Sequence, residues 1–370
     1  MEFEVNRIAM LEVAKNAGQV VPVRSNIDVL NGVLVESDEH TNEVILTATN
    51  FDISIQHKVK AVVEESGSVF IESKMLVGML SLISSEFVSF SSTSPELVKV
   101  LGSNCSYEIN CISANHYPKP VMPFPEETVK LSGICSLAKR TIFAVSKEDS
   151  KPALQCVNIK LQNNAVHAVA CDGIRMILVR NEAESFGNHE FLVPAKALRM
   201  LSSISTDEDI FEVGDVGDEI VFMKENMMLT VKKIEGSFID VNKVVKAVIS
   251  AYTATTDAYR IKEAIELMII GENTEPLNIV LSNGHVNLRR NGSYSDVKSY
   301  VPANISKDTP DTGFYYNADN LYRLFKILEG KIRMEFDARG VMLVKTKNEV
   351  YFQMPQREPA NVSGYAKKVA

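Results

Sequence analysis

The sequence predicts an α+β fold made of three copies of one unit, each with two helices packed on antiparallel sheets. Three similar helical segments recur at steps of 122 and 123 residues when Lys74, Lys196 and Asp319 are placed in register. Each of them is followed by alternating apolar and polar residues, which are typical of strands. A chain of 370 residues, 45% of them hydrophobic, is also too long for one ordinary core, so two or three domains are expected.

The recurring helix has a clear pattern of apolar residues. It occupies SKMLVGMLSLIS (73–84), PAKALRMLSSIS (194–205) and NADNLYRLFKIL (317–328). Apolar residues coincide in the three copies, first at Leu76, Leu198 and Leu321 and then at Met79, Leu201 and Leu324. A spacing of three residues places both positions on one face of a helix.

A shorter amphipathic helix is expected earlier in each unit, at 7–17, at 133–145 and, with a looser pattern, at 258–268. In the first two units a strand ends at equivalent places, Thr49-Asn50-Phe51 and Cys171-Asp172-Gly173, which are 122 residues apart. The repeats therefore predict three domains, 1–125, 126–247 and 248–370, the last with a short C-terminal extension at 358–370.

Composition excludes several classes of protein. The sequence contains no apolar run long enough for a membrane helix and does not begin like a signal peptide, so a cytoplasmic protein is expected. The five cysteines form an odd set without a CxxC pair, which indicates reduced, mostly buried side chains rather than disulfides or a zinc site. No metal and no cofactor is therefore expected.

The predicted helices differ in charge from the rest of the chain. Their spans contain eleven basic and five acidic residues, so they carry +6, whereas the whole chain carries −8 and the remainder −14. The basic residues are Arg7, Lys15, Lys74, Lys139, Arg140, Lys196, Arg199, Arg260, Lys262, Arg323 and Lys326. If the helices line one surface, a phosphate backbone is attracted there and repelled elsewhere. The sequence shows no motif that reads bases, so contacts to DNA are expected at phosphates and independent of sequence.

An enzyme is the first alternative, and the sequence gives it little support. The six histidines show no HExxH spacing, and there is neither a Gly-rich phosphate loop nor a GxSxG elbow. Asp172 is a conceivable catalytic acid, but its equivalent in the first unit is Asn50, which favours a turn-forming role for both. The acidic stretch 207–219 lacks the spacing of an EF-hand and is expected to form a solvated hairpin.

Six stretches of the chain resemble the bacterial DNA polymerase III beta subunit, the sliding clamp. They are LTATNFDISI (46–55), KRTIFAVSKEDSKPAL (139–154), HAVACDGIRMILV (167–179), FLVPAKALRML (191–201), EGSFIDV (235–241) and FQMPQR (352–357). The specific feature is AxxDGxRM near the middle together with MPxR near the end, on a three-fold repeat. The resemblance covers essentially the whole chain.

The resemblance implies a protein without a catalytic site. Three clamp domains per chain, joined head to tail in a homodimer, would form a ring with helices lining the hole and sheets outside. The ring would encircle double-stranded DNA and confer processivity on the replicative polymerase. Implied partners are the polymerase III alpha subunit, repair proteins and a clamp loader. The alternative is a clamp-like interaction scaffold, a divergent paralogue that does not encircle DNA.

Two sets of functional residues follow from the resemblance. The family binds linear peptides between its second and third domains, and the matching positions here are Leu154, Cys171, Gly173, Ile174, Arg175, Met176, Ile239, Lys243, Val244, Val341, Phe352, Met354, Pro355 and Arg357. DNA contacts carry over to Arg24, Lys74, Lys151 and Lys196. Cys171, Ile174 and Met176 replace residues that are often threonine, histidine and leucine in the family, so a more apolar pocket is expected.

Overall fold

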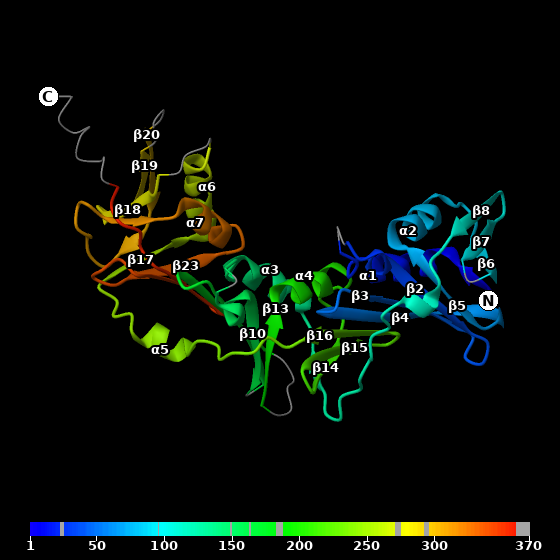
Figure 1. The fold of residues 1–370 in the computed structure, drawn as a ribbon. Helices are drawn as coiled ribbons and strands as arrows, with labels where there is room; N and C mark the ends of the chain where they lie inside the picture. Colours follow the sequence, from blue (N-terminus) through cyan, green and yellow to red (C-terminus); the bar gives the residue numbers. More distant parts are fainter. Residues whose placement is uncertain are drawn as a thin grey trace. The chain divides into compact units, whose positions relative to one another are not determined.

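A computed structural model describes residues 1–359 except 23–25, 95, 149, 163, 183–187, 271–274 and 292–295 (Figure 1). The chain forms two compact units, one made of Met1–Ser136 and Lys196–Ile234 and the other of Leu137–Ala195 and Glu235–Ala370. The unit boundaries fall within helix α3 (Ile134–Thr141), after the first residue of helix α4 (Ala195–Ser203) and between Ile234 and Glu235, so most of α3 belongs to the second unit and most of α4 to the first. Every strand pair between the described strands is antiparallel, and the predicted α+β class is confirmed.

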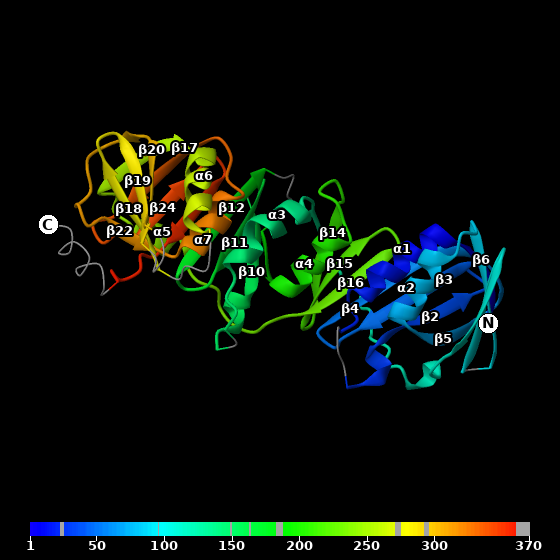
Figure 2. The same cartoon turned by 90° about the horizontal axis from the view of Figure 1, so that it is seen from above.

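The first unit contains one twelve-stranded sheet and the helices α1 (Arg7–Gly18) and α2 (Ser73–Leu82), which pack on each other (Figure 2). The main path of the sheet runs β8-β7-β6-β1-β4-β16-β15-β14-β9, and β3, β2 and β5 follow one another from β4. The strands are β1 (Glu2–Asn6), β2 (Gly32–Asp38), β3 (Glu43–Thr49), β4 (Ile53–Glu65), β5 (Gly67–Glu72), β6 (Phe87–Ser94), β7 (Leu97–Gly102), β8 (Cys105–Asn110), β9 (Val129–Leu131), β14 (Phe211–Val216), β15 (Glu219–Lys224) and β16 (Met227–Lys232).

The second unit has a nine-stranded sheet, β13-β10-β11-β12-β25-β24-β23-β17-β21, and a four-stranded sheet, β20-β19-β18-β22. Its helices are α5 (Val241–Lys246), α6 (Ala258–Met268) and α7 (Ala318–Phe325). The strands are β10 (Cys156–Gln162), β11 (Ala165–Cys171), β12 (Arg175–Glu182), β13 (His189–Pro194), β17 (Tyr252–Asp257), β18 (Leu277–Ser282), β19 (His285–Asn291), β20 (Asp296–Pro302), β21 (Asn304–Ile305), β22 (Phe314–Tyr316), β23 (Lys331–Phe336), β24 (Met342–Lys345) and β25 (Glu349–Gln353).

The six helices expected from the sequence are present, and the apolar face of each is buried. In α6 the buried residues are Ala258, Ile261, Ala264, Ile265 and Met268, which follow the spacing of one helical face. The first helix of the first repeat and that of the third repeat are capped alike. Asn6 and Asp257 both accept hydrogen bonds from main-chain N–H groups in the first turn of the helix. Helix α3 is shorter than expected, since Ile142–Ala144 forms a 3₁₀ turn.

Two strand pairings in the chain share the same register, and we call each of these pairings a joint. In the first, β16 pairs with β4 so that Thr230 lies opposite Ser54. In the second, β25 pairs with β12 so that Phe352 lies opposite Met176. These residues of β4 and β12 are equivalent, because each is the first paired residue after its hairpin turn, Thr49 opposite Ser54 and Cys171 opposite Met176.

The joints also share a main-chain hydrogen bond from the turn that precedes the joining strand. The amide of Lys58 donates to the carbonyl of Asn226 over 2.9 Å, and that of Arg180 donates to the carbonyl of Asn348 over 2.8 Å. The two asparagines are 122 residues apart, as the sequence repeat requires. A third asparagine, Asn104, lies another 122 residues earlier, in the turn before β8. Strand β8 ends the sheet path of the first unit.

Candidate functional site

An apolar cluster in the second unit contains many of the residues expected in a peptide pocket. Leu154, Val169, Cys171 and Met176 are buried at its centre. The partly buried side chains packed against them are Leu178, Phe238, Ile239, Val241, Val244, Val245 and Phe352. The cluster thus joins strands β11, β12 and β25 with the segment around α5, which are far apart in the sequence.

The turn between β11 and β12 limits this cluster on one side. The Asp172 carboxylate accepts hydrogen bonds from the amides of Ile174 and Arg175 over 2.9 and 2.8 Å, so it forms the turn, as expected. Gly173 has a φ of +92°, which a residue with a side chain rarely adopts, and a Cβ there would meet no atom within 4 Å. Burial raises the pKa of Cys171, so this thiol stays protonated and behaves as an apolar group.

Arg175 is held by its neighbours. Its Nε donates to Asp172 over 2.8 Å and its Nη1 donates to the side-chain oxygen of Asn320 on α7, also over 2.8 Å. The guanidinium lies 5.6 Å from the centre of the Phe143 ring. Burial lowers the pKa of Arg175, while Asp172 opposes this shift. These contacts connect β12 to α7 and to the 3₁₀ turn after α3, so Arg175 has a structural role.

The segment after β25 runs beside this turn. The amide of Met354 donates to the carbonyl of Ile174 over 2.8 Å, and the amide of Gln356 donates to that of Tyr315 over 2.6 Å. Ile174 is 53% exposed and Met354 is 39% exposed, so two apolar side chains reach solvent from adjacent backbone segments. Pro355 is half-buried and Arg357 is exposed.

Eight of the expected pocket residues are not members of the apolar cluster. Six of these lie in or beside the turn and in the segment after β25, namely Gly173, Ile174, Arg175, Met354, Pro355 and Arg357, and the other two are Val341 and Lys243. Val341 is buried, and its amide donates to Asp337. The side chain of Lys243 is 86% exposed and forms an ion pair with Asp240 over 3.5 Å. The sequence reasoning missed Val169, Leu178, Phe238, Val241 and Val245. The alternation in β11 and β12 identifies the first two as inward-facing, and the apolar spacing of 238–245 could have indicated the other three.

The structure describes three of the four lysine and arginine residues expected to contact DNA. Lys74 and Lys196 are the second residues of α2 and α4, and Lys151 precedes the 3₁₀ turn Pro152–Gln155; all three are exposed. Arg24 lies outside the described residues. Two other basic residues of the helices have partners: Arg140 forms an ion pair with the buried Glu349, and the Arg7 guanidinium donates to the carbonyls of Leu80 and Ser85.

Within the described residues, no group of three or more His, Cys, Asp or Glu side chains is arranged to hold a metal ion. None of the helices described is long and apolar enough to cross a membrane.

Comparison with known proteins identifies similar chains along most of the sequence. The family model for the N-terminal domain of the DNA polymerase III beta subunit matches residues 1–123, and the model for its central domain matches residues 128–240. A protein named "Beta sliding clamp" from Chlamydia pneumoniae is 26% identical over 361 residues, which cover 95% of this chain and 88% of that protein. A Staphylococcus aureus protein of the same name is 23% identical over 256 residues, 66% of this chain and 67% of that protein.

Solved structures share the fold. The crystal structure of the DNA polymerase sliding clamp from Bacillus subtilis matches with a TM-score of 0.88 and 18% identity, over 97% of this chain and all of that one. The DNA polymerase III beta subunit from Thermotoga maritima matches with a TM-score of 0.86 and 16% identity over the same shares. The repeated-domain fold expected from the sequence is therefore confirmed.

Proposed function

Because the chain belongs to the family of DNA polymerase III beta subunits, we propose that it is a sliding clamp whose ring encircles duplex DNA and confers processivity on the replicative polymerase. In this proposal two copies join head to tail, each contributing three domains at 1–125, 126–247 and 248–370. The protein is non-catalytic and acts in the cytoplasm, where bacterial DNA is replicated. The observation that carries the proposal is the joint, which occurs twice among the described strands, whereas the strands that would form a third copy do not pair with each other there.

The third joint requires two strands that end their sheets, and β8 and β20 meet this requirement. Strand β8 ends the sheet path of the first unit, and β20 ends the four-stranded sheet of the second. Exposed strand edges offer unpaired main-chain groups that pair with another chain. We propose that β8 of one copy pairs with β20 of the other, so that each copy uses both edges and the ring closes.

The repeat determines the register of this pairing. Asp296 is the first paired residue after the β19–β20 turn, so it is equivalent to Ser54 and Met176. Applying the register of the two known joints pairs Glu108 with Asp296, Tyr107 with Val297, Ser106 with Lys298 and Cys105 with Ser299. The carbonyl of Asn104 would then accept from the amide of Tyr300. Lys99 and Arg289 flank the two facing carboxylates, because they lie opposite Glu108 and beside Asp296 in their own sheets.

A disulfide cross-link tests this register with a native cysteine. Opposite residues of an antiparallel pair have Cα atoms about 4.5 to 5.5 Å apart, which a disulfide spans. We expect Ser299→Cys to form an oxidised dimer through Cys105 on non-reducing gels, because two symmetric cross-links close the ring. Lys298→Cys is the matched control, since Ser106 lies opposite it. Loss of the cross-link in the double variant Cys105→Ser/Ser299→Cys would show that none of the other cysteines forms it. In a separate measurement, a strictly monomeric mass by light scattering would contradict the ring.

The remaining parts of the proposal concern its ligands. The apolar cluster, with Ile174 and Met354 at its exposed margin, supports docking of a linear peptide from the polymerase alpha subunit, the clamp loader or a repair protein. In this proposal, Arg357, Pro355 and the other expected pocket residues also belong to the peptide site. Exposed Lys74, Lys151 and Lys196 support contacts to DNA phosphates, and Arg24 is proposed with them.

A further inference from the structure

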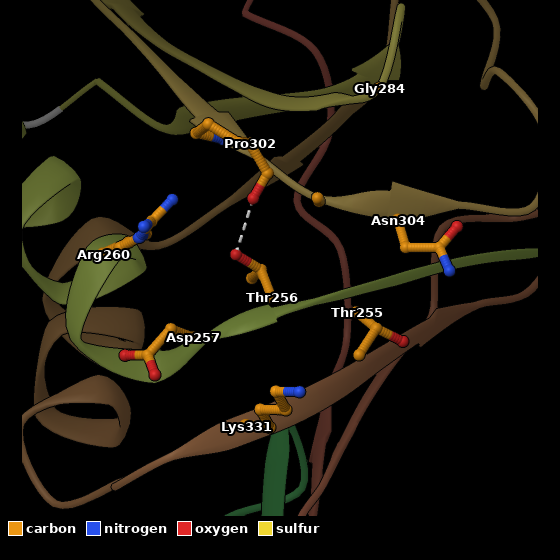
Figure 3. A pocket seen from close by; sticks show the side chains of 9 residues that line it. Thr255, Thr256, Asp257, Arg260, Gly284, Pro302, Asn304 and Lys331 are labelled. Carbon is orange, nitrogen blue, oxygen red and sulfur yellow. Dashed lines mark hydrogen bonds between the residues drawn. The ribbon is translucent and has the colours of Figure 1, made fainter.

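A cleft with several charged and polar lining residues lies in the second unit, where the N-terminal end of α6 approaches β20, β21 and β23 (Figure 3). Its volume is about 710 Å³, and it is lined by Thr255, Thr256, Asp257, Arg260, Gly284, Pro302, Ala303, Asn304 and Lys331. The Thr256 hydroxyl already donates its hydrogen bond to the carbonyl of Pro302 over 2.8 Å, so it is not free to donate to a ligand. Arg260 and Lys331 enter the cleft region from different elements, a helix and a strand, as Figure 3 shows.

Two cationic groups of the cleft have no carboxylate partner among the residues that the structure describes. Arg260 and Lys331 are exposed, and neither forms an ion pair there. By contrast, nearby basic residues on the same helix and strand do form ion pairs. Lys262 pairs with Glu266 over 3.7 Å, and Arg333 pairs with Glu335 over 2.9 Å. One carboxylate oxygen of Asp257 is used as the helix cap, where it accepts from the amide of Tyr259 over 2.9 Å. The charged lining residues therefore sum to +1.

The corresponding corner of the first repeat carries different side chains on equivalent strand pairs. The two corners correspond because Asn6 pairs with Phe87 before α1 as Asp257 pairs with Lys331 before α6. Thr255 pairs with Asn304, as Glu4 pairs with Val62. Lys331, Asn304 and Thr255 thus take the places of Phe87, Val62 and Glu4, and Arg260 takes that of Ala9. The corner is therefore apolar and acidic in the first repeat and cationic in the third.

We propose that this cleft binds a phosphate group, through charge-assisted hydrogen bonds from Arg260 and Lys331 and neutral ones from Thr255 and Asn304. A phosphate presents several acceptor oxygens, and a guanidinium together with an ammonium matches it in charge and geometry. The Asp257 carboxylate repels a phosphate and so limits the affinity of the site. Removal of this negative charge should therefore strengthen binding, whereas removal of either positive charge should weaken it. The four binding residues lie outside the segment of β20 proposed to pair with the other copy, although Pro302 at the edge of the cleft belongs to that strand.

The test uses the full-length protein and two probes, inorganic pyrophosphate by isothermal titration calorimetry and a short DNA duplex by fluorescence anisotropy. We expect Arg260→Ser and Lys331→Ser each to weaken binding roughly tenfold, the scale of a lost charge-assisted hydrogen bond. Lys262→Ser, which removes the same charge from the same helix, should leave binding within about twofold, because its ammonium is already paired. Asp257→Asn should tighten binding and keep the helix cap, because asparagine and aspartate are comparable N-cap residues and Asn6 caps α1 in this chain.

The two probes distinguish the source of the phosphate. Binding of pyrophosphate with this pattern of variants identifies a site for a free phosphate ligand, and the pattern with duplex alone identifies a site for a backbone phosphate. Equal weakening by Arg260→Ser, Lys331→Ser and Lys262→Ser would overturn the proposal, because it would reduce the effect to net charge. So would an Asp257→Asn protein that is folded by circular dichroism and binds neither probe more tightly.

Discussion

His57 is a mostly buried imidazole within the first joint. It lies on β4 opposite Met227 of β16, and its Nδ1 is 3.4 Å from the side-chain amide nitrogen of Asn16 on α1. Burial and, to a lesser extent, the positive charge of Lys224 lower its pKa from 6.5 to about 4. The side chain is therefore neutral at physiological pH, and its protonation would place a second cation beside Lys224.

This shift gives the fold a defined loss of stability in mild acid. As the pH falls from 6.5 to 4, the unfolded chain protonates His57 while the folded chain does not, so the free energy of unfolding decreases. A pKa shift of this size corresponds to a loss on the order of 3 kcal/mol. We expect urea unfolding at pH 7.5 and pH 4.5 to show a smaller difference for His57→Gln than for the unaltered protein. Equal differences would show that other groups carry the acid sensitivity.

At the scale of elements, the apolar cluster has both buried and exposed residues, so substitutions can distinguish an effect on peptide binding from an effect on folding. Met176 on β12 is 2% exposed, so Met176→Ala should lower the free energy of unfolding by about 2 to 5 kcal/mol as well as impair any binding. Met354 after β25 is 39% exposed, so Met354→Ala should leave the melting temperature nearly unchanged. We expect Met354→Ala to weaken a polymerase-derived peptide by about 1 to 2 kcal/mol, as for an interface anchor.

The matched control for this experiment is Ile249→Ala, because Ile249 is 81% exposed in the same unit and lies outside the cluster. Peptide titration followed by fluorescence anisotropy measures all three variants. Undiminished affinity in the Met354→Ala protein would move the peptide site elsewhere.

Sequence pattern predicted the elements better than their contacts. Apolar residues three apart identify α2, α4 and α7, because burial of one helical face imposes that spacing. Helix α5 was missed, because it has only six residues and depends on the Asp240 cap. The meeting of Met176 with Phe352 was expected only through the family resemblance, since no local pattern records which strands pair when they lie 176 positions apart. The exposure of Lys243 and the partners of Arg175 likewise depend on tertiary contacts.

At the scale of the whole molecule, topology should control retention on DNA. We expect the oxidised Ser299→Cys dimer, closed after loading onto nicked circular DNA, to remain bound in high salt and to be released when the DNA is linearised. High salt weakens phosphate contacts, so only encirclement explains retention. Gel filtration of the protein–DNA complex before and after linearisation measures this. Release from circular DNA would favour the clamp-like scaffold that does not encircle its ligand.

The joints also bear on how far such a chain can diverge. They consist of main-chain hydrogen bonds, which are the same for almost every amino acid, so a substitution on β4, β12, β16 or β25 changes packing without erasing the pairing. Selection can therefore alter the side chains that face partners while the assembly persists. Shape and binding preference are then separable properties: the corners of the first and third repeats share their strand pairings, but one carries phenylalanine, valine and glutamate where the other carries lysine, asparagine and threonine.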